Sequence, residues 1–226
     1  MKKIGLFSLA LVMALGSLGI GYAHWSDQLY INGTVYTGEV LIGFVGQETD
    51  DAGTALDPVN TAQVPACAPC PPGDKHVATT TCKLLNQRTH CTDEPAEHNG
   101  VPQYEKMHIT MDNVYPWYNP SVYFDIANCG TIPVVITGAT VIKTSVEGTW
   151  VKVNIPLPKC TPVQVDLDGD GDDDIAIGFT GPADQQIDPC QVKRFDLHFC
   201  FKQELNECTD YDFEIKIDAV QWNKAP

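Results

Sequence analysis

Strict alternation of apolar and polar residues is the feature of this 226-residue chain that most restricts its fold. The clearest run extends from Tyr211 to Ala219, where the odd positions are apolar and the even positions are charged. Successive side chains of a strand point to opposite faces, so this pattern predicts a strand with one buried face. No apolar stripe of helical period and useful length follows residue 23. The sequence therefore predicts an all-β fold.

Similar alternation and β-rich composition recur along the chain, with Pro-, Gly- and Asn-containing turns between the segments. Many short strands at this spacing are typical of a β-sandwich, and a jelly roll is the form expected here. The remaining expected strands are 40–44, 107–111, 122–126, 132–136, 139–146, 149–155 and 192–201.

The N-terminus has the order of a secretory signal. Lys2 and Lys3 precede an apolar run at 4–20, and small residues lead to Ala23. We expect cleavage after Ala23, which leaves 24–226 as a single secreted domain with no membrane attachment. A permanent anchor is the weaker interpretation because glycines interrupt a short run. A pilin-type leader that keeps the apolar helix is the other alternative.

Charge and cysteine content narrow the class of protein further. The chain has 29 acidic and 14 basic residues, for a formal net charge of −15. Such a surface repels nucleic acid and anionic lipid, so neither is expected as a partner, and it attracts cations. Nine cysteines in a chain of this size indicate an oxidising compartment. The protein is therefore expected outside the cell or on its surface.

Residues 47–105 differ from the rest of the chain. They are polar and rich in Pro, Thr and Asp, and they are interpreted as a long disulfide-rich loop insertion in the domain. Zinc binding by His90 and His98 and a redox role for the Cys67-x-x-Cys70 spacing are less favoured alternatives. The pairing stays open, and an odd count leaves one thiol unpaired or bonded to another chain. The candidate disulfide cysteines are Cys67, Cys70, Cys82, Cys91, Cys200 and Cys208.

The sharpest chemical signal is an acidic run between 166 and 174. It has the form D-x-D-x-D-G-x-x-D, with Gly171 at the turn, and no basic residue interrupts it. This spacing of carboxylates suits Ca²⁺, to which a backbone carbonyl at 172 adds a ligand. Ile177 stands where an EF-hand has Glu, and strand-like flanks favour a hairpin loop; a solvated acidic turn is the alternative. The candidate ligands are Asp166, Asp168, Asp170, Asp172 and Asp174.

Three stretches carry a family resemblance. They are 20–42 around the predicted cleavage point, 109–133 with its Asn128-Cys-Gly130-Thr-Ile-Pro133 motif, and 211–223 ending in Gln-Trp-Asn. Together they resemble the TasA/camelysin family of exported proteins. The resemblance implies a jelly-roll subunit of an extracellular filament or biofilm matrix. It also implies head-to-tail self-association by donor-strand complementation, in which a leading segment of one subunit completes the next.

Residues 24–37 would supply that donor strand. Leu29, Tyr30, Ile31 and Val35 lie in an extended, alternating segment whose apolar side chains could fill a neighbour's groove. The alternative is that this segment is the first strand of its own sheet. Asn32 begins an Asn-Gly-Thr sequon, which is either a glycosylation site or a chance triplet.

Two other functions remain as alternatives. One is a monomeric calcium-dependent surface binding module. The other is a metalloprotease, the activity attached to camelysin. The chain has no HExxH, GxSxG or GxxxxGK motif and no residue that we assign to peptide hydrolysis, so no enzyme activity is expected.

Overall fold

The computed structural model describes residues 8–9, 11–15, 38–59, 70–88, 102–144, 151–156, 162–203, 205 and 208–224. The chain divides into two units, 1–37 and 38–226. Of the first unit only 8–9 and 11–15 are described, and these residues are helical. No described helix has both the length and the apolar character needed to cross a membrane.

The second unit confirms the predicted all-β fold. It contains eleven strands among the described residues and a short 3₁₀ segment, Trp222–Lys224. The strands are β1 (Ile42–Thr49), β2 (Thr79–Arg88), β3 (Gln103–Val114), β4 (Ser121–Asn128), β5 (Val134–Thr144), β6 (Val151–Pro156), β7 (Val163–Val165), β8 (Ile175–Thr180), β9 (Gln186–Ile187), β10 (Val192–Phe201) and β11 (Thr209–Gln221).

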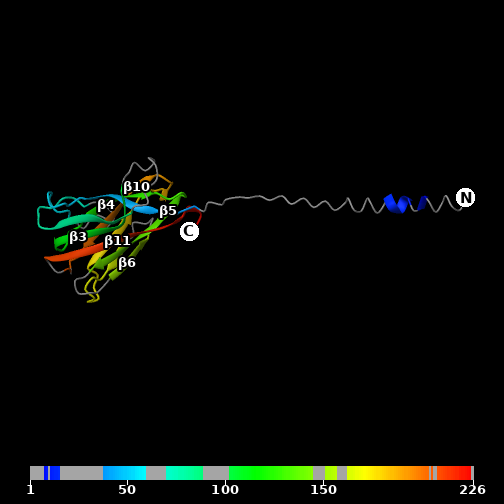
Figure 1. The fold of residues 1–226 in the computed structure, drawn as a ribbon. Coiled ribbons are helices and arrows are strands. Elements are labelled where there is room, and N and C mark those ends of the chain that lie inside the picture. Colours follow the sequence, from blue (N-terminus) through cyan, green and yellow to red (C-terminus); the bar gives the residue numbers. More distant parts are fainter. Residues whose placement is uncertain are drawn as a thin grey trace. The chain divides into compact units, whose positions relative to one another are not determined.

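The strands form one antiparallel sheet that folds back on itself as a sandwich (Figure 1). One half has the order β2-β3-β11-β5-β6, with β9 beside the start of β5. The other half has the order β1-β4-β10-β8-β7. Among the residues that the structure describes, a single pair, Phe44 opposite Tyr104, links the two halves through β1 and β3. Because this backbone link is so short, the two halves can lie as facing layers of the sandwich.

The core lies between the two halves and follows the alternation in the sequence. Tyr211, Phe213 and Ile215 of β11 are buried, whereas the intervening positions are more exposed. Phe213 packs against Phe199 of β10 with ring centroids 5.3 Å apart, so aromatic side chains bridge the halves. Burial of apolar area of this kind is the main force that holds a sandwich together.

The segment 47–105 is built into the sandwich at several points. Residues 79–88 form β2, which pairs with β3 from Thr79 opposite Asp112 to Arg88 opposite Gln103. Ala78, just before β2, is fully buried in the core. The described parts of this segment are therefore more than a surface loop, and β2 is a strand that the sequence interpretation did not anticipate.

Two expected strands are one continuous strand in the structure. The segments 132–136 and 139–146 correspond to β5, which pairs with β11 along Val134–Thr144. Asp218 of β11 pairs with Gly138 and Ala219 with Ile136, so Thr137 is an extra residue in β5, and this bulge accounts for the break in the pattern.

Candidate functional site

The acidic run forms the loop of a β-hairpin. β7 and β8 pair in antiparallel fashion, and Val165 opposite Ile175 is the last pair before the loop. The strand flanks expected from the sequence are confirmed, and the helices of an EF-hand are not found on either side. Leu167 is 4% exposed and anchors the loop in the core. The carboxylates therefore lie in a short hairpin loop at the edge of the sandwich.

Asp166 organises the first half of this loop. Its two carboxylate oxygens accept hydrogen bonds from the backbone N–H groups of Gly169 at 2.6 Å and Gly171 at 3.0 Å. These bonds, that from Gly169 foremost, lower the pKa of Asp166. Gly169 and Gly171 have φ values of 87° and 101°, where a residue with a side chain is strained.

Asp168 and Asp170 continue the same pattern. The Oδ1 of Asp168 accepts the N–H of Asp170 at 3.1 Å, and the Oδ1 of Asp170 accepts the N–H of Asp172 at 2.9 Å. Each carboxylate therefore closes a tight turn over the two residues that follow it. The loop uses its own acidic side chains to satisfy its backbone donors.

Asp174 closes the loop from the buried side. It is 4% exposed, and its Oδ2 accepts the N–H of Leu167 at 2.6 Å. Burial raises the pKa of Asp174, and the nearby charges of Asp168 and Asp166 act in the same direction. Lys143 donates to the Leu167 carbonyl at 2.7 Å, and burial lowers the pKa of this lysine. The loop therefore concentrates negative charge beside a buried carboxyl.

Three of the five expected metal ligands converge. Asp166, Asp168 and Asp174 each offer a ligand atom, and these atoms all lie within 4.8 Å of one another. Asp170 and Asp172 do not belong to this group and are exposed. Ca²⁺ takes six to eight oxygen ligands, so carbonyls or water would have to complete its shell. Chemically, the triad suits a hard divalent cation better than a soft one.

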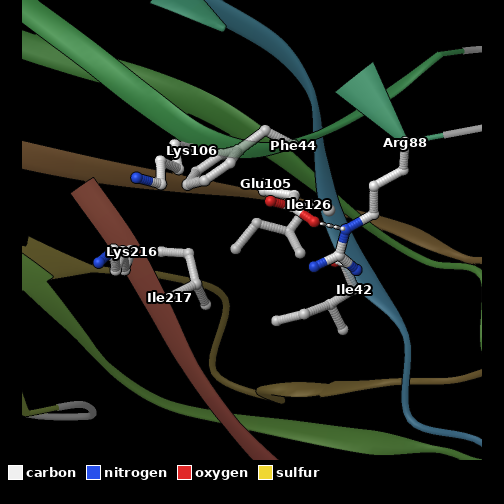
Figure 2. Close-up of a pocket in the computed structure, with 9 residues that line it drawn as sticks. Ile42, Phe44, Arg88, Glu105, Lys106, Ile126, Lys216 and Ile217 are labelled. Atoms are coloured by element: carbon white, nitrogen blue, oxygen red, sulfur yellow. Dashed lines mark hydrogen bonds and ion pairs between the residues drawn. The ribbon is translucent and has the colours of Figure 1, made fainter. Parts of the chain in front are cut away.

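A second feature is a groove at one end of the sandwich, with a volume of about 300 Å³. It is lined by residues of β1, β2, β3, β4 and β11. Figure 2 shows the side chains of Ile42, Ile126 and Ile217 around this space, with the ring of Phe44 beside them. Ile126 and Phe44 are 1% exposed and form its floor. Ile42 and Ile217 are only partly buried, so the groove is open above an apolar floor, and four of its nine lining residues are charged.

The groove lies where the sandwich leaves a strand edge open. β11 pairs with β3 only as far as Ile215 opposite Met107, but it pairs with β5 to Gln221 opposite Val134. Among the described residues, no strand pairs with residues 216–221 on the side of β3. β1 has a similar gap, since Phe44 is the one described residue of β1 that pairs with β3. Both strands therefore offer backbone groups toward the same region.

Charged residues surround the groove. Arg88 forms an ion pair with Glu105, at 3.2 Å between Nε and Oε1, and donates to the Ile42 carbonyl at 2.9 Å. Lys106 and Lys216 pair with the two carboxylate oxygens of Glu214 at 3.2 and 3.3 Å. The rim is thus richer in basic groups than the strongly acidic chain as a whole. Long side chains also cover part of the apolar floor.

Sequence reasoning missed two buried carboxylates that brace the start of the segment 47–105. Asp51 and Asp57 are both 0% exposed. Asp51 accepts the hydroxyl of Tyr118 at 2.8 Å, and Asp57 accepts the N–H groups of Val77 and Ala78, each at 3.0 Å. The bonds to Asp57 satisfy two backbone donors ahead of β2, and the bond to Asp51 satisfies a buried hydroxyl, so the role of both carboxylates is structural. A polar, Pro-rich composition gave no sign of this burial.

A buried histidine on β10 also has a structural explanation. His198 is 4% exposed, and its Nδ1 lies 3.0 Å from the hydroxyl of Ser121, which is 1% exposed. Burial lowers the pKa of His198, which favours the neutral ring at pH 7. Serine and histidine occur together here as in some hydrolases, but both side chains are shielded from solvent. The pair therefore has no access to a substrate.

The structure describes some of the candidate disulfide cysteines but not the proposed donor strand. Cys70, Cys82 and Cys208 carry free thiols in the structure, so the disulfides proposed for them are not observed and stay predictions. Burial raises the pKa of Cys70 to about 11 and that of Cys82 to about 12, so both thiols are protonated at neutral pH. The other predictions fall outside the described residues: Cys67, Cys91, Leu29, Tyr30, Ile31, Val35, the Asn32 sequon and the alternative zinc ligands His90 and His98.

Comparisons with protein-family models, with curated proteins and with solved structures found no match for this chain. Its function is therefore inferred from its residues and their geometry, together with the resemblance in its sequence motifs.

Proposed function

We propose that this chain is a secreted structural subunit of an extracellular filament or biofilm matrix. Its body is assigned as a jelly roll, and residues 24–37 of one copy act as the donor strand for the next. The single observation that carries this proposal is the open edge of β11 at 216–221, which lies beside a groove with an apolar floor. An unpaired strand edge is a template for a strand from another chain.

The proposed donor has the chemistry that the groove requires. Leu29 and Ile31 have the two-residue spacing of one strand face, which would turn both toward the floor formed by Phe44 and Ile126. Backbone groups of the donor would pair with residues 216–221. Burial of each large apolar side chain would contribute about 1.5–3 kcal/mol. The contact joins different surfaces of two copies, so repetition produces an open chain of subunits.

Calcium is proposed as a stabilising ion in this assembly. Asp166, Asp168 and Asp174 would hold it in the hairpin loop between β7 and β8. The ion would offset repulsion among the three carboxylates and the cost of burying Asp174. Extracellular modules bind Ca²⁺ with dissociation constants of about 10⁻⁴ to 10⁻³ M, which suits a protein outside the cell. We assign the ion no catalytic step.

The filament proposal is tested with the mature chain and with a variant that lacks residues 24–37. We expect negative-stain electron microscopy to show filaments for the complete chain and only discrete particles for the truncated one. A synthetic peptide of residues 27–37 should bind the truncated protein and block its incorporation into growing filaments. Replacement of Ile217 by Asp in the full chain should abolish both peptide binding and assembly, because it places a charge in the groove.

Val192→Asp is the matched control, since Val192 is 55% exposed and lies outside the groove. This variant should assemble normally, and circular dichroism should show that both variants remain folded. Filaments that form equally well without residues 24–37 would contradict donor-strand assembly. A complete chain that stays monomeric in the presence of calcium would favour the surface binding module instead.

A further inference from the structure

Two cysteines that the sequence interpretation did not pair lie at the ends of neighbouring strands. Cys129 directly follows β4, and Cys190 lies two residues before the start of β10. β4 and β10 are antiparallel neighbours, and Ala127 opposite Val192 is the terminal pair of their ladder. Beyond that pair the register shifts, because Asn128 bonds to both Cys190 and Gln191, so Cys190 lies beside the peptide that joins Asn128 to Cys129.

Backbone hydrogen bonds show that the segment after β4 and the segment before β10 stay together beyond the end of the ladder. The N–H of Asn128 donates to the carbonyl of Gln191 at 3.0 Å, and the N–H of Cys190 donates to the carbonyl of Asn128 at 2.9 Å. Disulfides span Cα separations of about 4.4–6.8 Å. The N–H of Cys190 bonds to the carbonyl of the residue directly before Cys129, so the backbones of the two cysteines are adjacent and within reach of such a bond.

The conformation of Cys190 is an independent observation. Asp188, Pro189, Cys190 and Gln191 form a turn closed by a hydrogen bond from the Gln191 N–H to the Asp188 carbonyl, at 3.1 Å. Cys190 has a φ of 66° at the third position of this turn, where glycine is strongly preferred. A residue with a side chain costs stability at such a position. Non-glycine residues in strained backbone conformations cluster at functional sites.

We propose that Cys129 and Cys190 form a disulfide bond on the outer side of the β4 and β10 half. The N–H groups of Cys129 and Gly130 both donate to the carbonyl of Leu41, at 2.8 and 3.1 Å. The bond therefore fastens three segments together: the lead into β1, the turn after β4 and the turn before β10. It closes this end of the sandwich covalently, at the point where the described body of the chain begins.

The oxidation balances with a small-molecule disulfide, such as oxidised glutathione, as the oxidant. The thiolate of Cys190, which is the exposed residue of the two, attacks one sulfur of the oxidant and releases one small thiol. The thiolate of Cys129 then attacks the Cys190 sulfur and releases the second small thiol. The two cysteines lose two protons and two electrons, and the oxidant is reduced to two thiols. This bond forms whether or not the chain assembles into filaments.

The direct test is disulfide mapping of the full chain. The protein is equilibrated in a mixture of reduced and oxidised glutathione, alkylated without reduction, digested and analysed by mass spectrometry. The expected result is a linked peptide pair that contains Cys129 and Cys190. The proposal is overturned if these two residues are recovered in alkylated form or are joined to other cysteines.

Variants give a second measurement that does not depend on digestion. Oxidation should raise the melting temperature of the wild type, and about 5–15 °C of that rise should disappear in Cys129→Ser and Cys190→Gly. Under reducing conditions Cys190→Gly should be at least as stable as the wild type, because glycine relieves the positive φ. Cys160→Ser is the control and should keep the full rise, because Cys160 belongs neither to the proposed bond nor to the candidate disulfide cysteines. An unchanged rise in Cys129→Ser would refute the bond.

Discussion

At the residue scale, burial and negative charge conflict most directly at Asp174. This carboxyl is 4% exposed and shares a small volume with Asp166 and Asp168. Burial, followed by these neighbouring charges, raises its pKa above the ordinary 3.8. Its contribution to stability without a cation is therefore complete below pH 3.8. That contribution is lost as the pH rises through the folded-state pKa.

The effect of Asp174→Asn on the melting temperature should therefore have opposite signs without and with calcium. In EDTA at pH 7 the variant should melt at or slightly above the wild-type temperature, because the amide removes a buried charge but keeps an oxygen for the Leu167 N–H. In millimolar calcium it should melt several degrees below the wild type, because one ligand is weakened. Thermal melts from pH 4 to pH 8 in both buffers measure the difference.

Asp170→Asn is the matched control for this prediction, since Asp170 belongs to the same loop but not to the converging triad. It should retain most of the calcium-dependent rise in melting temperature. Equal losses in the two variants would remove the distinction between triad and loop. A wild-type melt that does not respond to calcium would remove the site.

At the element scale, the hairpin between β7 and β8 depends on backbone conformations that most residues avoid. Gly171 has a φ of 101°, and its N–H donates to Asp166 Oδ2 at 3.0 Å. A Cβ added at Gly171 would meet no atom within 4 Å, so only backbone strain opposes a substitution there. A substitution at Gly171 therefore tests backbone strain alone, without any steric overlap.

Gly171→Ala should lower the free energy of unfolding by about 1–2 kcal/mol. Gly171→Asn should lose less, because Asn tolerates positive φ better than other residues with a side chain. Urea denaturation in EDTA isolates the backbone effect from calcium binding. Equal stability of the alanine variant and the wild type would contradict this account of the loop.

At the scale of the whole molecule, contacts across the sandwich hold its two halves together. The halves share one strand pair, Phe44 opposite Tyr104, so the remaining cohesion comes from side chains in the core. Phe199 and Phe213 approach from opposite halves, and Phe201 and Tyr211 do the same with ring centroids 5.6 Å apart. Aromatic pairs of this kind add to the free energy of apolar burial.

Phe213→Ala should reduce the free energy of unfolding by about 3–5 kcal/mol, because it leaves a cavity between the halves. Phe213→Leu should lose clearly less, since it keeps most of the buried volume. Chemical denaturation followed by circular dichroism provides the comparison. A loss below about 1 kcal/mol for the alanine variant would mean that the halves do not depend on this contact.

The amount that could be predicted from the sequence varies among the elements. Alternation in 211–219 and 107–111 locates β11 and β3, because their inward positions are strongly apolar. β2 escaped prediction because its core-facing residues include Thr80 and Cys82, which carry little of the apolar signal. Asp51 and Asp57 were missed for a related reason, since their burial depends on donors from distant residues.

By itself, the sequence determined which residues share a strand face and where carboxylates are dense enough to attract a cation. A two-residue period and the spacing of aspartates are local properties, so they can be read along the chain. Tertiary structure alone decided where β3 leaves β11 and which aspartates converge. Alternation encodes the face of a strand but not its partner or register, which emerge only when distant segments pack together.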